Sequence, residues 1–438
     1  VQRPAAGMRV TAVHKQTALA SEAGRDLMGP GEAVLRLLRV WPPPGPEARG
    51  LLHRLPYPLL ALQAGMAGVL ASTAAHLHQG GAGGDEESEA QQTTVALFIV
   101  GTIIGMLVKI WSFMGQRGRM QVLLSLLLEM RRRYLRDHTG ARPRAQDHGV
   151  TLFYILQGNA VLAALAWSVQ PLLSGSARRL PLPAWLPFDA TVSPYYEAVY
   201  AGQALSLLLV PQISLCINIC YFALMLHLAA ELAVLCDNVA AVGWRRTSKE
   251  PAPQSQQQVL DREFAASSEN RLLEDNVRHH QLIIRAVSEL QQIMSTSVYI
   301  HLFVNMINVC SHIFVISVVL LETGEMAVVV SQACSLAVFL SGIALYCVIG
   351  HTIIDQSERL PEAVYSSGWT GADLSFRRSV SILLVRASHP LSITVGKMRV
   401  LSKPTFVQVL NGSYTLFNFL YRTQSDKEQR ERLGLQDS

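Results

Sequence analysis

The sequence predicts an all-α membrane protein with seven transmembrane helices, a cytoplasmic N-terminus, an extracellular C-terminus and a cytoplasmic helical anchor region. Of the 438 residues, 50% are hydrophobic and only 16% are charged, and the mean hydropathy is +0.25. These values are typical of a polytopic membrane protein. Apolar stretches near the roughly 20 residues that cross a bilayer lie at residues 57–78, 93–111, 150–173, 197–220, 298–321, 326–349 and 395–421, and the first is the weakest.

The basic residues lie on one side of these spans. Residues 1–56, 112–149, 236–281 and 350–392 together carry 26 Lys and Arg side chains, whereas residues 79–92 carry none. Because basic loops are retained in the cytoplasm, the N-terminus is predicted inside and the C-terminus outside, opposite to G-protein-coupled receptors. The net charge of +5 arises in these loops, so it indicates contact with membrane lipids and no nucleic-acid partner.

Two spans are predicted to continue as helices below the membrane. Apolar residues recur at helical spacing between residues 260 and 294, ahead of the fifth span. The fourth span runs on to residue 236 without a helix breaker. We therefore expect a packed helical base in the cytoplasm.

A shorter amphipathic helix is predicted between the last two spans. Residues 374–386 place Val380, Leu383 and Leu384 on one face beside arginines, and Pro390 ends the pattern. Such a helix lies either on the membrane surface or in an anchor between subunits. Composition does not separate these alternatives.

The last span carries a polar stripe. Gln408, Asn411, Thr415, Asn418 and Arg422 follow one another at intervals of three and four residues, which places them on one helical face. Polar groups in a membrane face protein or a water-filled cavity because hydrocarbon cannot hydrogen-bond them. The stripe is therefore either a pore wall or a contact with other helices of the same subunit.

The motifs for enzyme chemistry are missing from the sequence. It contains no His-Glu-x-x-His, P-loop or nucleophile-elbow pattern, and its six cysteines lie in or beside spans without a metal-binding cluster around them. We expect no enzyme activity, cofactor, metal or disulfide framework. A membrane transporter remains an alternative, although seven spans do not divide into two related halves.

Residues 363–415 resemble the C-terminal signature of insect odorant receptors. The matching residues are Ala363, Tyr365, Trp369, Arg377, Arg378, Leu383, Leu384, Arg386, Pro390, Gly396, Lys397, Leu401, Ser402, Phe406, Leu410 and Ser413-Tyr414-Thr415. The resemblance implies an odorant-tuning subunit of a ligand-gated, non-selective cation channel of four subunits, located in the plasma membrane of a sensory neuron dendrite. A gustatory receptor channel of the same superfamily is the alternative.

The resemblance also assigns roles in the last span. The pore-lining and gate residues are Gln408, Asn411, Thr415, Leu416, Asn418, Phe419 and Arg422. Within this set Phe419 corresponds to the apolar side chain that closes the pore near its outer end, with Leu416 one turn below. A hydrophobic constriction of this kind gates by dewetting.

Two positions depart from the family's pattern. Lys403 and Pro404 stand where the family often has an acidic or apolar pair, and Pro404 predicts a break or bend because it removes a backbone hydrogen bond. Arg422 falls near the outer mouth of the pore, where four copies would repel cations. We therefore expect a heterotetramer with an odorant receptor co-receptor subunit.

By the same resemblance, a small volatile ligand binds in the outer half of the helix bundle. The candidate ligand-binding residues are Phe98, Ala163, Trp167, Tyr196, Tyr200, Gln203, Leu207, Asn308 and Ser331. Trp167 is the leading candidate because an aromatic wall one turn from the small Ala163 leaves room for a ligand. For Tyr196 the alternative is a place in the aromatic belt at the membrane interface.

The chain is thus expected to divide into seven segments. They are a cytoplasmic N-terminal segment at 1–56, spans one to four with the ligand pocket at 57–235, a cytoplasmic helical extension at 236–297, spans five and six at 298–349, a cytoplasmic anchor helix at 350–394, the pore helix at 395–421 and an extracellular tail at 422–438.

Overall fold

The computed structural model describes residues 27–37, 40–41, 68, 86–173, 180–182, 192–242, 256–322, 324–370, 372–397 and 399–432. The expected first span at 57–78, apart from residue 68, lies outside these residues. So do most of the N-terminal segment and the end of the expected tail.

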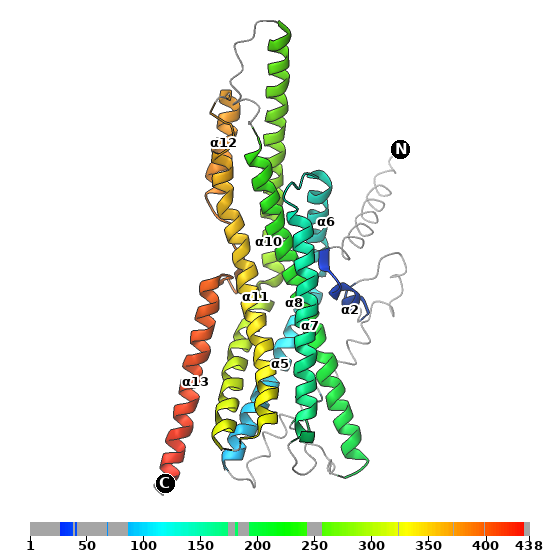
Figure 1. Ribbon diagram of the computed structural model, residues 1–438, viewed down its shortest axis with the longest axis vertical. Helices are drawn as coiled ribbons and strands as arrows, with labels where there is room; N and C mark the ends of the chain where they lie inside the picture. The colour runs from blue at the N-terminus through cyan, green and yellow to red at the C-terminus, as the bar shows by residue number, and fades with distance from the viewer. Residues whose placement is uncertain are drawn as a thin grey trace, which may run out of the picture.

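The described chain is almost entirely helical, which confirms the all-α fold. Its elements are α2 (Gly31–Leu37), α5 (Glu86–Gly115), α6 (Arg117–Arg133), α7 (Ala141–Leu173), α8 (Tyr195–Ala240), α10 (Gln256–Glu322), α11 (Met326–Tyr365), α12 (Leu374–Ala387), β1 (Thr394–Val395), β2 (Arg399–Val400) and α13 (Lys403–Arg432). Figure 1 shows an elongated bundle in which α10 and α11 run most of its length and α13 follows its outside.

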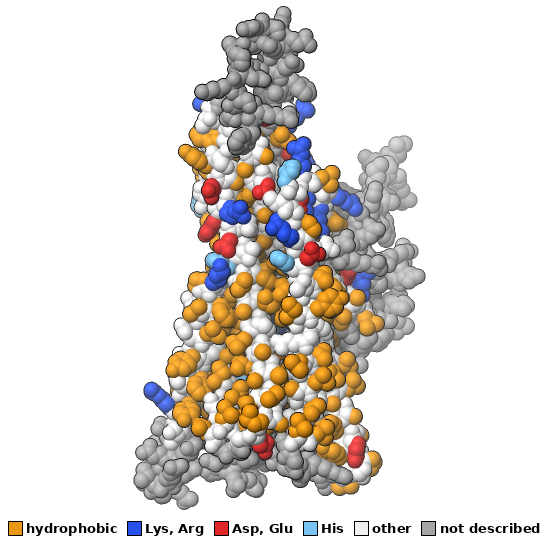
Figure 2. All heavy atoms as spheres, viewed as in Figure 1, with side chains coloured by type: hydrophobic (Ala, Val, Ile, Leu, Met, Phe, Trp, Pro, Cys, Tyr) orange, Lys and Arg blue, Asp and Glu red, His pale blue; other side chains and the backbone are white. Residues whose placement is uncertain are grey.

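Several helices are long and apolar enough to cross a membrane. Within the described residues these are α7, α8, α10 and α11, and α5 with α6 makes a fifth if that pair, bent by 62°, counts as one span. Helix α13 is not among them because its polar stripe lowers its hydropathy. Figure 2 shows apolar side chains covering the lower part of the molecule and charged ones gathered above them.

Helix α8 forms the centre of the bundle. Every residue from Ile213 to Met225 is buried, and the helix packs against α2, α7, α10 and α11. A helix that is apolar around its whole circumference requires neighbours on every side. At 46 residues α8 is far longer than a span, as is α10 at 67, so both continue beyond an apolar span as their sequences predict.

The amphipathic helix at 374–386 is confirmed as α12. It buries Phe376, Val380 and Leu383 and packs against α10 and α11. Its opposite face leaves Ile382 and Val385 exposed. The helix therefore covers the projecting ends of α10 and α11 at the upper end of the bundle (Figure 1).

The expected pore helix has different bounds from those predicted at 395–421. Residues 394–400 form a short antiparallel hairpin, in which Thr394 pairs with Val400, and the helix runs from Lys403 to Arg432. At the turn, Gly396 has a φ of 60°, and a Cβ there would lie 2.5 Å from the Tyr299 ring. Only glycine fits this position.

Pro404 does not bend α13, contrary to the prediction. The helix starts at Lys403, so Pro404 lies in its first turn. The backbone N–H groups of a first turn have no partner within the helix, so the missing donor of proline costs nothing there. Proline marks the start of the helix instead.

Candidate functional site

A cavity of about 510 Å³ lies among α5, α7, α8, α10 and α11. Its apolar lining includes Ile99, Ile103, Met106, Leu156, Ala160, Ala163, Trp167, Leu182, Leu207, Val210, Phe222 and Phe339. Ligand sites in proteins are concave, mostly apolar and about 300 to 1,000 Å³ in volume. The cavity therefore has the size and chemistry of a site for a small organic molecule.

Three of the predicted ligand residues line this cavity. They are Ala163 and Trp167 on α7 and Leu207 on α8. The Trp167 side chain is buried, and its indole Nε1 donates a hydrogen bond to Ser335 Oγ on α11 at 2.6 Å. The aromatic wall is thus held in place by the helix opposite.

The other predicted ligand residues whose side chains are described stand outside the lining. They are Tyr196, Tyr200, Gln203, Asn308 and Ser331. Some support residues that do line it: Gln203 Oε1 accepts from the Leu182 N–H at 2.9 Å, and Asn308 Nδ2 donates to Thr102 Oγ1 at 3.1 Å. The side chain of Phe98 lies outside the described part of the structure.

The directions in which the side chains point account for these differences. Ser331 hydrogen-bonds to Val328 O in its own helix, whereas Ser335, one turn further, faces the cavity. The Tyr200 hydroxyl donates to Ser168 O on α7, and its ring lies beside that of Tyr196, with centroids 5.7 Å apart. Hydropathy places a residue along a membrane helix but does not fix the direction in which it points.

One end of the cavity is polar, and the sequence reasoning missed its central residue. Lys109 on α5 is 1% exposed. Its Nζ lies 3.0 Å from Ser214 Oγ, 2.9 Å from Asn218 Oδ1 and 3.0 Å from His301 Nδ1. A lysine within an apolar stretch marks a functional site by default, and the signal that could have found Lys109 is its place two residues before the expected end of its span.

Further polar groups complete this cluster. The Tyr346 hydroxyl donates to Asn218 Oδ1 at 2.9 Å, and Asn305 Nδ2 lies 3.2 Å from His301 Nε2. Ser214, Asn218, His301 and Asn305 all line the cavity. The cavity is therefore apolar along most of its walls and capable of hydrogen bonding at one end.

The polar stripe of α13 faces away from the bundle. Gln408, Asn411, Thr415, Phe419 and Arg422 are exposed, and Leu416 and Asn418 are half-buried. The opposite face carries buried Thr405 and Ser413, and Ser413 Oγ donates to Met306 O of α10 at 3.1 Å. The stripe is thus not a contact with other described helices of this subunit.

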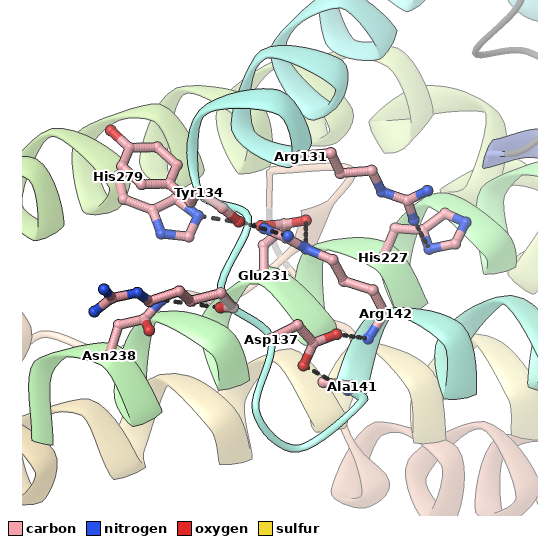
Figure 3. A network of polar contacts seen from close by, with 10 residues as sticks. Arg131, Tyr134, Asp137, Ala141, Arg142, His227, Glu231, Asn238 and His279 are labelled. Carbon is pink, nitrogen blue, oxygen red and sulfur yellow. Dashed lines mark hydrogen bonds and ion pairs between the residues drawn. The ribbon is translucent and has the colours of Figure 1, made fainter. Parts of the chain in front are cut away.

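A second polar cluster ties the loop between α6 and α7 to α8 and α10 (Figure 3). Arg142 Nε and Nη2 donate to the two Glu231 carboxylate oxygens at 2.8 and 2.7 Å. His279 Nε2 lies 3.1 Å from Glu231 Oε2, and its ring stacks on Tyr134 with centroids 4.1 Å apart. This bidentate pairing compensates the buried charge of Glu231.

Asp137 closes the start of α7 in the same region. Its carboxylate oxygens accept from the backbone N–H groups of Ala141 and Arg142, each at 3.0 Å. Burial acts to raise the pKa of Asp137, but these hydrogen bonds from Arg142 and Ala141 outweigh it, so the pKa lies below its ordinary value. The carboxylate is held in its charged form at a helix N-terminus.

The family model and the related sequences that match this chain all describe odorant receptors. The model of the family described as 7tm Odorant receptor matches residues 89–414. Odorant receptor Or1 of Anopheles gambiae is 22% identical over 351 residues, which are 76% of this chain and 81% of that protein. Odorant receptor 10 of Aedes albopictus is 27% identical over 146 residues, which are 33% of this chain and only 38% of that protein.

Solved structures have the same fold. The insect olfactory receptor OR5 from Machilis hrabei, solved in complex with eugenol, superposes with a TM-score of 0.69 over 90% of this chain and 97% of that chain, at 16% identity. A second structure of the same receptor gives a TM-score of 0.66. The chain therefore belongs to the insect odorant receptor family, whose members are multi-pass membrane receptors and not enzymes.

Proposed function

We propose that this chain is the odorant-binding subunit of a ligand-gated, non-selective cation channel. The observation that carries the proposal is the apolar cavity of about 510 Å³, because two of its walls, α10 and α11, also hold α13. The Machilis hrabei receptor in complex with eugenol supports a small organic ligand for this fold. A volatile molecule in the cavity would bias the positions of α10 and α11 and, through them, that of α13.

The route from cavity to α13 consists of close contacts. On α10, the Gly396 N–H of the hairpin donates to Ser295 O at 3.2 Å. On α11, a Cβ at Gly350 would lie 2.6 Å from Leu401 Cβ. The hairpin is thus fixed to both helices just before α13 begins, so a shift of either helix would move the base of α13.

The exposed stripe of α13 is assigned to the pore. Gln408, Asn411 and Thr415 would line the conduction path, and Phe419 with Leu416 would close it by dewetting. Exposure of these polar groups in a single subunit supports this role, since they need water or other subunits as partners. Under this proposal, residues 236–297 and 350–394 lie in the cytoplasm and the tail lies outside, in keeping with the distribution of basic residues.

Arg422 favours a heteromeric channel. It is exposed on α13, beyond Phe419, and four copies around one pore would repel cations. A co-receptor subunit in the same tetramer would reduce the number of these charges. We therefore place the chain in a heterotetramer with an odorant receptor co-receptor, in the plasma membrane of a sensory neuron dendrite.

The test is whole-cell current in cells expressing the chain alone and with an odorant receptor co-receptor while volatile compounds are applied. We expect evoked cation current only with the co-receptor, and a changed response in Trp167→Ala but not in Leu162→Ala, whose side chain is exposed on the same helix. Evoked current from the chain alone would contradict the argument from Arg422. Silence under both conditions would contradict the proposed function.

A further inference from the structure

We propose that the cavity selects small apolar molecules that carry one uncharged hydrogen-bond acceptor, a carbonyl oxygen, and that this oxygen lies against Asn305 and Ser214. The inference rests on the proposed function, because it names the class of ligand for the same cavity. The inference follows from which atoms carry hydrogens in the polar cluster around Lys109, at the polar end of the cavity.

The orientation of the Asn218 amide is fixed by its neighbours. Asn218 Oδ1 lies 2.9 Å from both Lys109 Nζ and the Tyr346 hydroxyl. If the amide were turned over, its NH₂ group would meet the donor hydrogens of Lys109. The oxygen therefore accepts here, and Nδ2 points to His301 Nε2 at 3.5 Å.

The amide orientation determines which nitrogen of His301 carries the proton. Two amide groups face Nε2, those of Asn218 and, at 3.2 Å, Asn305. Because amide N–H groups only donate, Nε2 is the acceptor and the proton of the neutral ring lies on Nδ1. That N–H then points at Lys109 Nζ, 3.0 Å away.

The His301 Nδ1–H needs an acceptor. The Lys109 nitrogen has a lone pair that can accept only when the amine is uncharged, because an ammonium group has none. Lys109 is therefore a neutral amine that accepts from His301 and donates to Ser214 and Asn218. The groups with which Lys109 bonds contain no carboxylate. The whole cluster is neutral, so it offers hydrogen bonds to a ligand but no counter-charge to an anion.

The cluster offers two donor hydrogens on its cavity side. Ser214 Oγ accepts from Lys109, and its own hydrogen has no acceptor among the described residues. Asn305 uses one amide hydrogen on His301, and its second has no acceptor in the part of the chain that the structure describes. A carbonyl oxygen, with two lone pairs, can accept from both.

The other three serine hydroxyls of the cavity do not compete for that oxygen, and the Thr102 hydroxyl on α5 already accepts from Asn308 Nδ2. Ser206 donates to Gly202 O at 2.8 Å, Ser335 donates to Ser331 O at 3.1 Å, and Ser341 donates to Val338 O at 2.9 Å. Each of these hydrogens is thus used within its own helix. The spare donors of Ser214 and Asn305 therefore set the orientation of a carbonyl ligand, with its apolar body toward Trp167.

The experiment compares 2-nonanone, nonane and nonanoic acid on the full chain expressed with the co-receptor. We expect the ketone to act at a concentration at least about tenfold lower than the hydrocarbon, since each neutral hydrogen bond contributes roughly fivefold. Asn305→Leu and Ser214→Ala should each lower this ratio by about fivefold. Ser317→Ala, whose hydroxyl bonds to Ile313 O on α10 outside the cavity, should leave it unchanged.

Potency ratios within one variant do not depend on the amount of folded protein. Equal potency of ketone and hydrocarbon, or ratios unchanged in both cavity variants, would overturn the inference. A response to nonanoate stronger than to the ketone at neutral pH would contradict the inference that the cluster is uncharged.

Thermal stabilisation of the purified chain by the same compounds measures binding without channel activity. Selective stabilisation by the ketone without any current would support the inference while contradicting the proposed channel function. Stabilisation by none of the compounds, together with no current, would overturn both.

Discussion

Gly350 on α11 faces Leu401 so closely that a side chain at position 350 would collide with it. A Cβ there would lie 2.6 Å from Leu401 Cβ and 2.9 Å from its carbonyl oxygen. Leu401 itself is buried, and its N–H donates to Ile393 O at 2.9 Å. The segment that leads into α13 is therefore packed directly on the backbone of a helix that lines the cavity.

Gly350→Ala should destabilise this junction. Because the nearest atoms include backbone, the neighbour cannot rotate away, and overpacking of this kind costs about 1 to 3 kcal/mol. We expect a lower unfolding temperature of the purified protein and a smaller evoked current. Gly101→Ala is the matched control, since a Cβ there meets nothing within 4 Å; equal effects of the two changes would contradict the role of this contact.

Ser335→Ala should weaken responses by releasing Trp167. The substitution removes the acceptor of the 2.6 Å indole hydrogen bond, and a neutral hydrogen bond contributes about 1 kcal/mol, or roughly fivefold in potency. Trp167→Phe should have a similar effect, because it removes the donor and keeps an aromatic wall. Concentration–response curves measure both, and normal potency in both variants would show that this bond does not shape the site.

Phe419→Ala should produce current without ligand. Phe419 is 65% exposed in the single subunit, and in the proposed pore its ring supplies the apolar constriction, which a methyl group is too small to close. The measurement is holding current before any odorant is applied, which we expect to rise several-fold above that of the unchanged channel. Val407→Ala, at another exposed apolar position of α13, is the control, and leak in that variant alone would place the constriction elsewhere.

The sequence predicted the elements whose patterns are long and periodic. The apolar run around Ile213 and the amphipathic face containing Val380 both form helices in the expected places. A helix that buries a face needs apolar residues at regular intervals, and this spacing can be read from the sequence. The hairpin at Thr394–Val395 and Arg399–Val400 was missed, since two-residue strands carry no periodic pattern. Its turn packs Gly396 against Tyr299, which is far away in the sequence.

The cavity lining contains part of the predicted set. Trp167 and Ala163, one turn apart on α7, line it, whereas the predicted Ser331 lies one turn away from the lining residue Ser335. Contact of these residues with a ligand stays a prediction. Lys109 was missed because hydropathy cannot tell a lysine that ends a span from one that turns inward. The contacts of Lys109 with Ser214, Asn218 and His301 on other helices show that it points into the bundle.

The Asp137 carboxylate makes the stability of the start of α7 depend on pH. Its hydrogen bonds to the Ala141 and Arg142 N–H groups lower its pKa from the ordinary value of 3.8. Its stabilising effect is thus complete above about pH 4 and is lost as the pH falls through the lowered pKa. Asp137→Ala should cost about 1 kcal/mol at neutral pH.

Asp137→Asn separates charge from hydrogen bonding, because the amide oxygen still accepts from one backbone N–H while it does not titrate. Thermal unfolding from pH 7 to pH 3 should show a smaller loss of stability in this variant than in the unchanged chain, and the two should converge at the acidic end. Asp237 is not bonded to that helix start but to the Thr139 hydroxyl at 2.9 Å, so Asp237→Asn serves as the control. A difference between Asp137→Asn and the unchanged chain that stays constant over the whole range would show that the carboxylate does not titrate with folding.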